Sequence, residues 1–177
     1  MSEGGKIKST FIITKFVDRD GIIEKLSKAG EALEFLKKKF ACNLIEEKVI
    51  HGNIFLNEGI NMIWTAVCGG TFTPFNNTNA HIGVGDGTTP ASPTQTGLQG
   101  TNKCYKNMDE GYPIYGTNQK AVFRATFGAN EANFTWNEWT VANGPGDTYV
   151  NLNRKVESLG TKVQGTTWIF TVELSLS

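Results

Sequence analysis

The sequence lacks the features that mark export, membrane insertion or metal binding. No stretch reaches the ~18 consecutive apolar residues that a membrane-spanning helix needs, and the opening MSEGGKIKST has no apolar core of a signal peptide. The three cysteines, Cys42, Cys68 and Cys104, are an odd number without metal-type spacing, so each is expected to be a free, mostly buried thiol in a reducing compartment. We therefore expect a protein made in a reducing cytoplasm, with no membrane partner.

An excess of charge is missing as well. The 17 basic and 17 acidic side chains cancel, so nothing attracts nucleic acid or an anionic membrane to the chain as a whole. Residues 1–50 hold ten of the basic and eight of the acidic side chains, and the remainder depends on Asn, Thr, Ser and Gly for solubility. Neutral polar surfaces suit proteins that pack beside copies of themselves, because like-charge repulsion is avoided.

Nucleotide-binding motifs are incomplete. Residues 82–87 read IGVGDG, but a dinucleotide loop must open directly into a helix whose amide groups hold the pyrophosphate. Here TTPASP follows, and Pro90 and Pro93 prevent that helix. The glycines are therefore interpreted as turn residues, and residues 88–100 as an exposed loop.

Catalytic and metal-binding patterns are also missing. His51 and His81 belong to no spaced ligand set, and a nucleophilic pair of Cys104 with either histidine has no supporting motif. No GxSxG or DxDxDG pattern occurs, so the turn carboxylates are interpreted as solvated. We expect a non-enzymatic protein without catalytic, cofactor or metal residues.

What the sequence does contain is alternation typical of β-strands. Residues 6–17 and 167–176 alternate apolar and polar side chains, and the second run predicts a last strand tucked into a sheet. In residues 132–141 the apolar parity changes at Asn137-Glu138, which predicts a β-bulge. Seven to nine strands are expected, with turns every 8–14 residues.

Two helices interrupt the strands. Residues 22–41 place apolar side chains at intervals of four and three, which predicts one amphipathic helix packed either on its own domain or on a neighbouring subunit. Residues 57–68 predict a second helix with Asn57 as N-cap and Gly69-Gly70 as its stop. The face expected to be buried consists of Ile60, Ile63, Trp64 and Val67.

Together these elements predict a mainly β fold: an antiparallel β-sandwich or jelly-roll-like domain, or a partly closed barrel, with one short internal helix. Residues 1–53 are expected to form an N-terminal arm with a strand and an amphipathic helix, and residues 54–177 the sandwich domain. Trp136, Trp139, Tyr112 and Tyr115 suggest either core packing, subunit contact or a sugar-stacking platform.

The order of several segments resembles small virion structural proteins of tailed double-stranded DNA bacteriophages. The segments are FLNEGINMIW, AHIGVGDGTT, TGLQG, YKNMDEGYP, VFRATFGANEANFTWNEWTV and LNRKVESLGTKVQGTTWIFTVELSL. In that group a helix precedes an I-G-x-G-D/T-G-T-x-P strand and turn, and an N-R segment precedes a closing amphipathic strand. The similarity covers about residues 54–177 and does not include the first fifty residues.

This resemblance implies a capsid decoration (cement) protein of the virion, often a homotrimer, with the major capsid protein as partner. A tail or baseplate subunit is the alternative in the same class, and a carbohydrate-binding adhesin module is the alternative in another. A strand of the N-terminal arm could complete a neighbour's sheet, and the polar loop could touch a neighbour. The candidate subunit contacts are Phe11, Ile13, Thr88, Thr89, Pro90, Pro93 and Trp139.

Overall fold

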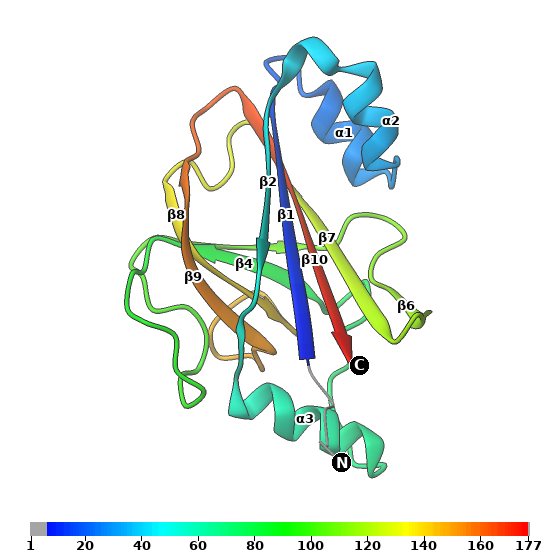
Figure 1. Ribbon diagram of the computed structural model, residues 1–177, viewed down its shortest axis with the longest axis vertical. Coiled ribbons are helices and arrows are strands. Elements are labelled where there is room, and N and C mark those ends of the chain that lie inside the picture. Colours follow the sequence, from blue (N-terminus) through cyan, green and yellow to red (C-terminus); the bar gives the residue numbers. More distant parts are fainter. Residues whose placement is uncertain (1–6, 177) are drawn as a thin grey trace, which may run out of the picture.

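Alternating apolar residues produce the two longest strands, β1 (Ile7–Val17) and β10 (Thr166–Leu176), which pair antiparallel along their whole length. The computed structural model describes residues 7–176, so the expected strand start at Lys6 lies outside the described residues. β10 lies between β1 and β7 in the middle of its sheet, which confirms the expectation that the last strand is tucked in (Figure 1).

All described strands form two five-stranded antiparallel sheets, so the chain is mainly β. The first sheet has the order β2-β1-β10-β7-β6, with β2 at Leu44–His51, β7 at Lys120–Phe127 and β6 at Ile114–Thr117. The second has the order β3-β9-β8-β4-β5, with β3 at Ile54–Phe55, β9 at Asn153–Thr161, β8 at Thr135–Ala142, β4 at His81–Gly85 and β5 at Lys103–Asn107. The ten strands exceed the expected seven to nine.

The two sheets face each other across one apolar core. Phe11 of β1 and Phe170 of β10 meet Trp139 of β8, with ring centroids 5.2 Å and 5.5 Å apart. Phe11, Ile13 and Trp139 are at most 1% exposed. All three are among the candidate subunit contacts, but they pack inside the chain's own core. Removing an aromatic side chain there lowers the free energy of unfolding by about 3–5 kcal/mol.

The expected N-terminal arm is joined to the rest of the fold. β1 and β2 belong to the same sheet as β10 and β7, although the expected boundary at residue 53 separates them. The bulge expected at Asn137-Glu138 is confirmed, because the register between β8 and β9 shifts between Trp136 and Glu138.

The prediction of a single helix over residues 22–41 is wrong. Two short helices, α1 (Ile22–Lys28) and α2 (Leu33–Lys39), are followed by the 3₁₀ turn η1 (Ala41–Asn43). Gly30 separates α1 from α2, because its φ of 84° is left-handed and its position lies against the Glu110 carbonyl. The helices pack on the outer face of their own first sheet, where Phe16, Ile23, Leu36 and Ile169 form a second buried cluster.

A buried ion pair also holds these helices. Arg124 of β7 donates to Asp109 at 2.9 Å and to the carbonyls of Ser27 and Glu31 at 2.9 Å each. Asp109 also accepts the hydroxyl of Thr126 at 2.8 Å. Burial, the largest influence, raises the pKa of Asp109 above its usual value, and the hydrogen bonds from these partners oppose that rise.

The expected internal helix is confirmed as α3 (Asn57–Val67), but its buried face differs from the expected one. Leu56 rather than Asn57 occupies the N-cap position. Gly59 packs on the backbone of Leu152, where a Cβ would lie 2.6 Å from the nearest atom. This close approach turns the opposite side of α3 outward, and Trp64 and Val67 are 62% and 70% exposed.

No helix among residues 7–176 has the length and apolar character needed to cross a membrane. The three thiols form no disulfide, as expected, but only Cys104 is partly buried. Cys42 and Cys68 are exposed, since Cys42 follows α2 in an open turn and Cys68 ends α3.

Candidate functional site

Residues 86–102 connect β4 to β5 as a long loop, and the carboxylate of Glu138 lies at its centre. The bulge in β8 lets both Trp136 and Trp139 face the core, so Glu138 faces the loop. Its carboxylate accepts backbone N–H groups of Gly87 (3.1 Å), Gln99 (3.0 Å) and Gly100 (2.6 Å). A side chain at Gly87 would collide with this carboxylate, which explains glycine there.

Arg154 of β9 completes this buried centre. Its guanidinium donates to Glu138 at 2.7 Å, to the Gln95 side-chain oxygen at 2.9 Å and to the Thr89 carbonyl at 3.0 Å. Both charged side chains are fully buried. Removing one partner from such a pair costs about 3–5 kcal/mol, because the other charge stays buried without compensation.

Two further carboxylates anchor the ends of the loop. Asp86 accepts the backbone N–H groups of Thr101 at 2.8 Å and Asn102 at 3.0 Å. Burial raises its pKa, but these hydrogen bonds and one from the Asn102 side chain outweigh burial and hold the pKa below its usual value. Asp147 accepts the Leu98 N–H at 3.0 Å and the Tyr105 hydroxyl. Burial, followed by the hydrogen bond to Asp147, raises the pKa of Tyr105.

The expectation of an exposed loop over residues 88–100 is confirmed only in part, because Gly97 and Leu98 are buried. Thr88, Thr89, Pro90 and Pro93 are all exposed. The amides of Gly87, Gln99 and Gly100 already donate to Glu138, so these groups are not available to bind a phosphate. Glu138 and Arg154, which hold the loop, were missed in the sequence, because β9 reads NRKVESLGT and its mostly polar pattern does not mark Arg154 as a buried side chain.

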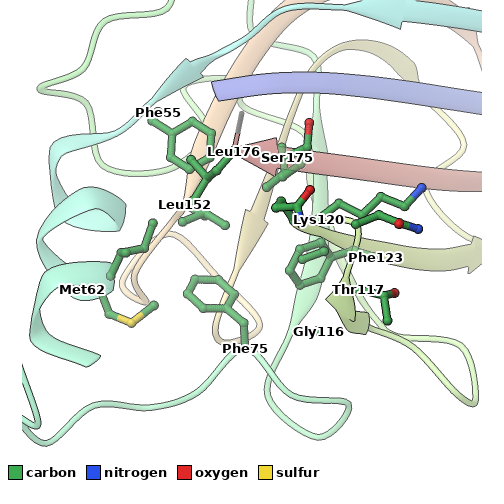
Figure 2. A pocket seen from close by; sticks show the side chains of 15 residues that line it. Phe55, Met62, Phe75, Gly116, Thr117, Lys120, Phe123, Leu152, Ser175 and Leu176 are labelled. Carbon is green, nitrogen blue, oxygen red and sulfur yellow. The ribbon is translucent and has the colours of Figure 1, made fainter. Parts of the chain in front are cut away.

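An apolar cavity of about 670 Å³ lies beside α3, between that helix and the ends of β7 and β10 (Figure 2). Its apolar lining includes Phe55, Met62, Ile63, Phe75, Ala121, Phe123, Leu152, Leu174 and Leu176. Lys120 on its wall is paired with Glu173 at 2.8 Å. The cavity therefore offers apolar surface and no unpaired charge from this lysine.

The loop and the cavity lie at the same end of the molecule. The N–H of Asn57, the first residue of α3, donates to the carbonyl of Pro93 at 2.8 Å. Trp64 on α3, Tyr115 on β6 and Leu176 on β10 are 62%, 70% and 58% exposed. Of these three residues, only Leu176 lines the cavity. Exposed aromatic and aliphatic side chains are typical of protein contact sites.

The other candidate residues do not assemble into a site. His81 makes a hydrogen bond of 2.8 Å with the Asn79 carbonyl, as expected for a structural histidine, and His51 is exposed. Burial raises the pKa of the Cys104 thiol, which does not favour a thiolate nucleophile. Among residues 7–176 no three His, Cys, Asp or Glu side chains form a metal-binding group.

The four aromatic rings considered as a sugar platform are not brought together on the surface. Trp136 and Trp139 are fully buried, while Tyr112 is half-buried and lies 4.4 Å from the Arg124 guanidinium. A carbohydrate-binding module predicted an exposed Trp139, so that alternative loses its main support.

Comparison with protein families, with characterised proteins and with solved structures finds no match for this chain.

Proposed function

We propose that this chain is a non-enzymatic structural subunit of a tailed-bacteriophage virion, a β-sandwich protein that binds neighbouring proteins through residues 86–102. The observation that carries the proposal is the anchoring of this loop. Its amides are held by the buried carboxylate of Glu138 and the half-buried carboxylate of Asp86, while Thr88, Thr89, Pro90 and Pro93 are exposed. A loop ordered before binding loses little conformational entropy on binding, so its contacts contribute fully to affinity.

A binding role agrees with the chemistry of the buried charged groups. Glu138 and Arg154 direct their hydrogen bonds to the chain's own loop, and Asp109 and Arg124 direct theirs to α1 and β7. A general acid or base must instead reach a substrate proton. The proposed place is the capsid exterior, with the major capsid protein as partner, and a tail or baseplate position is the second candidate.

Binding to virus particles tests the proposal. Purified chain should co-sediment with capsids that lack it, and the double variant T88R/T89R should lose most of this binding because two bulky charges replace small exposed hydroxyls. The control is Val163→Arg, since Val163 is 54% exposed in the turn between β9 and β10, at the opposite end of the molecule (Figure 1).

Equal binding by both variants would contradict a role of the loop. Absence of wild-type binding to capsids and to tails would contradict the virion assignment itself. Far-ultraviolet circular dichroism of each variant checks that its strands are intact.

A further inference from the structure

One edge of the first sheet combines apolar exposure with an open backbone. β2 lies at the end of the strand order, and its side away from β1 pairs with no strand among the described residues. Ile45 and Val49 on this strand are 53% and 50% exposed. Exposed edges with apolar side chains favour pairing with a further strand.

The direction of the backbone groups along β2 follows from one hydrogen bond. The N–H of Gly52 donates to the carbonyl of Ser9 at 3.1 Å, directly beyond the pair formed by His51 and Thr10. Antiparallel ladders alternate, so even-numbered residues of β2 bond to β1 and odd-numbered residues direct N–H and C=O outward. In agreement, the His51 carbonyl accepts a hydrogen bond from the Lys155 side chain at 3.2 Å rather than from the backbone of another strand.

We infer that two copies of this chain pair antiparallel through β2, about a twofold axis at Glu47. A twofold axis perpendicular to the sheet keeps each side chain on its own face, so only residues of equal parity can lie opposite each other. In this register Glu46 faces Lys48 of the partner subunit, twice per dimer. The pairs at Glu46 are of the type without mutual backbone bonds, in which opposite side chains approach most closely.

Other registers fit the charges less well. The Lys48 ammonium group is paired with Glu157 of its own chain at 3.3 Å, and an axis at Lys48 forms no ion pair across the interface, because it places Glu46 opposite the apolar Ile50. An axis at Val49 places Lys48 opposite Ile50. The axis at Glu47 brings two carboxylates together, but each is already paired with Lys37 of its own chain at 3.0 Å. Charged residues on an edge strand usually prevent edge pairing. Here Glu46 and Lys48 of the two copies lie opposite each other with complementary charges when the axis is at Glu47.

The contact is short. The β2 ladder is irregular opposite Lys15 and Phe16, so regular pairing is centred on Glu47 and limited to about residues 45–49, with Ile45 opposite Val49 of the partner subunit. We expect a weak, reversible dimer. This inference does not depend on the virion assignment, because it concerns only self-association.

Analytical ultracentrifugation tests the dimer. Over a concentration series up to about 0.5 mM the mass should rise from 19.4 kDa to twice that value. Glu46→Lys and Lys48→Glu should each weaken the dimer roughly tenfold or more, because both ion pairs become repulsive. The double variant E46K/K48E should restore association to within about threefold of wild type, although within each chain Glu46 also contacts Lys15 at 2.5 Å and Lys48 contacts Glu157 at 3.3 Å.

A cysteine pair tests the register. In a C42S/C68S background, Glu47→Cys should form an intermolecular disulfide, since directly bonded antiparallel positions have Cα atoms about 5.5 Å apart. Val49→Cys is the matched control and should not cross-link. A monomer at every concentration, single variants that associate like wild type, a trimer mass, or preferential cross-linking at Val49→Cys would each overturn the inference.

Discussion

Helices cover the outer face of the first sheet and a loop covers part of the outer face of the second, and a buried arginine–carboxylate pair holds each of these segments. α1 and α2 cover the first sheet and are tied to it by Arg124 and Asp109. Residues 86–102 cover part of the second and are tied to it by Arg154 and Glu138. The helices also bury an apolar cluster, whereas the loop is held mainly by polar contacts. The helices should therefore tolerate loss of their ion pair better than the loop does.

The largest effect is expected from Arg154→Met. This change leaves the Glu138 carboxylate buried without its partner and should lower the free energy of unfolding by about 3–5 kcal/mol. Chemical denaturation measures the loss, and hydrogen exchange should show faster exchange at the Gly87 and Gly100 amides. The matched variant Arg124→Met should leave the α1 amides comparatively protected. Equal loosening of loop and helices would contradict the difference between the two regions.

A smaller loss is expected from Leu36→Ala, which removes apolar contacts from under α2. Leu36 is fully buried, and the truncation should cost about 3 kcal/mol. Protection of α1 and α2 amides should fall while the Gly87 and Gly100 amides keep their exchange rates. Exposed Phe35→Ala, one residue away, is the control and should change stability little.

The smallest effect is a pH dependence due to Lys162. Burial lowers the pKa of this lysine from 10.5 to about 8, despite the nearby carboxylates of Glu131 and Glu24. Since the unfolded chain then binds more protons than the folded chain, Lys162 adds stability as the pH rises from about 8 towards 10.5. In denaturation between pH 7 and 9.5, the stability of wild type should rise above pH 8 faster than that of Lys162→Met, by about 1 kcal/mol per pH unit.

Parallel slopes for the two proteins would contradict a lowered pKa of Lys162. Using the difference between them removes most of the contribution of Cys104, whose pKa burial raises.

Local patterns were enough to predict much of the β architecture. Alternation predicted β1 and β10, and the parity change at Asn137 predicted the bulge, because side-chain direction along a strand depends only on position. The exposed character of Thr88 and Pro90 followed from turn residues. Features that depend on partners far along the chain were harder to predict.

The errors have physical causes in single residues. Gly30 breaks the helix pattern of residues 22–41, since its left-handed backbone suits a turn against Glu110. Gly59 rotates the buried face of α3 away from Trp64, because only glycine fits on the backbone of Leu152. Glu138 accepts hydrogen bonds from three loop amides and from Arg154, and no periodicity in the sequence encodes such contacts.

The pairing of β1 with β10 has a consequence for synthesis. Ile7 lies opposite Leu176, so the central pair of the first sheet joins residues near the two ends of the described chain. Contacts with such sequence separation form slowly. While the ribosome is still translating residues 18–165, β1 has no β10 to pair with in its own polypeptide. During that interval the β10-facing edge of β1 is open, and pairing of this edge with a strand of a neighbouring nascent chain is the misfolding route that this topology favours.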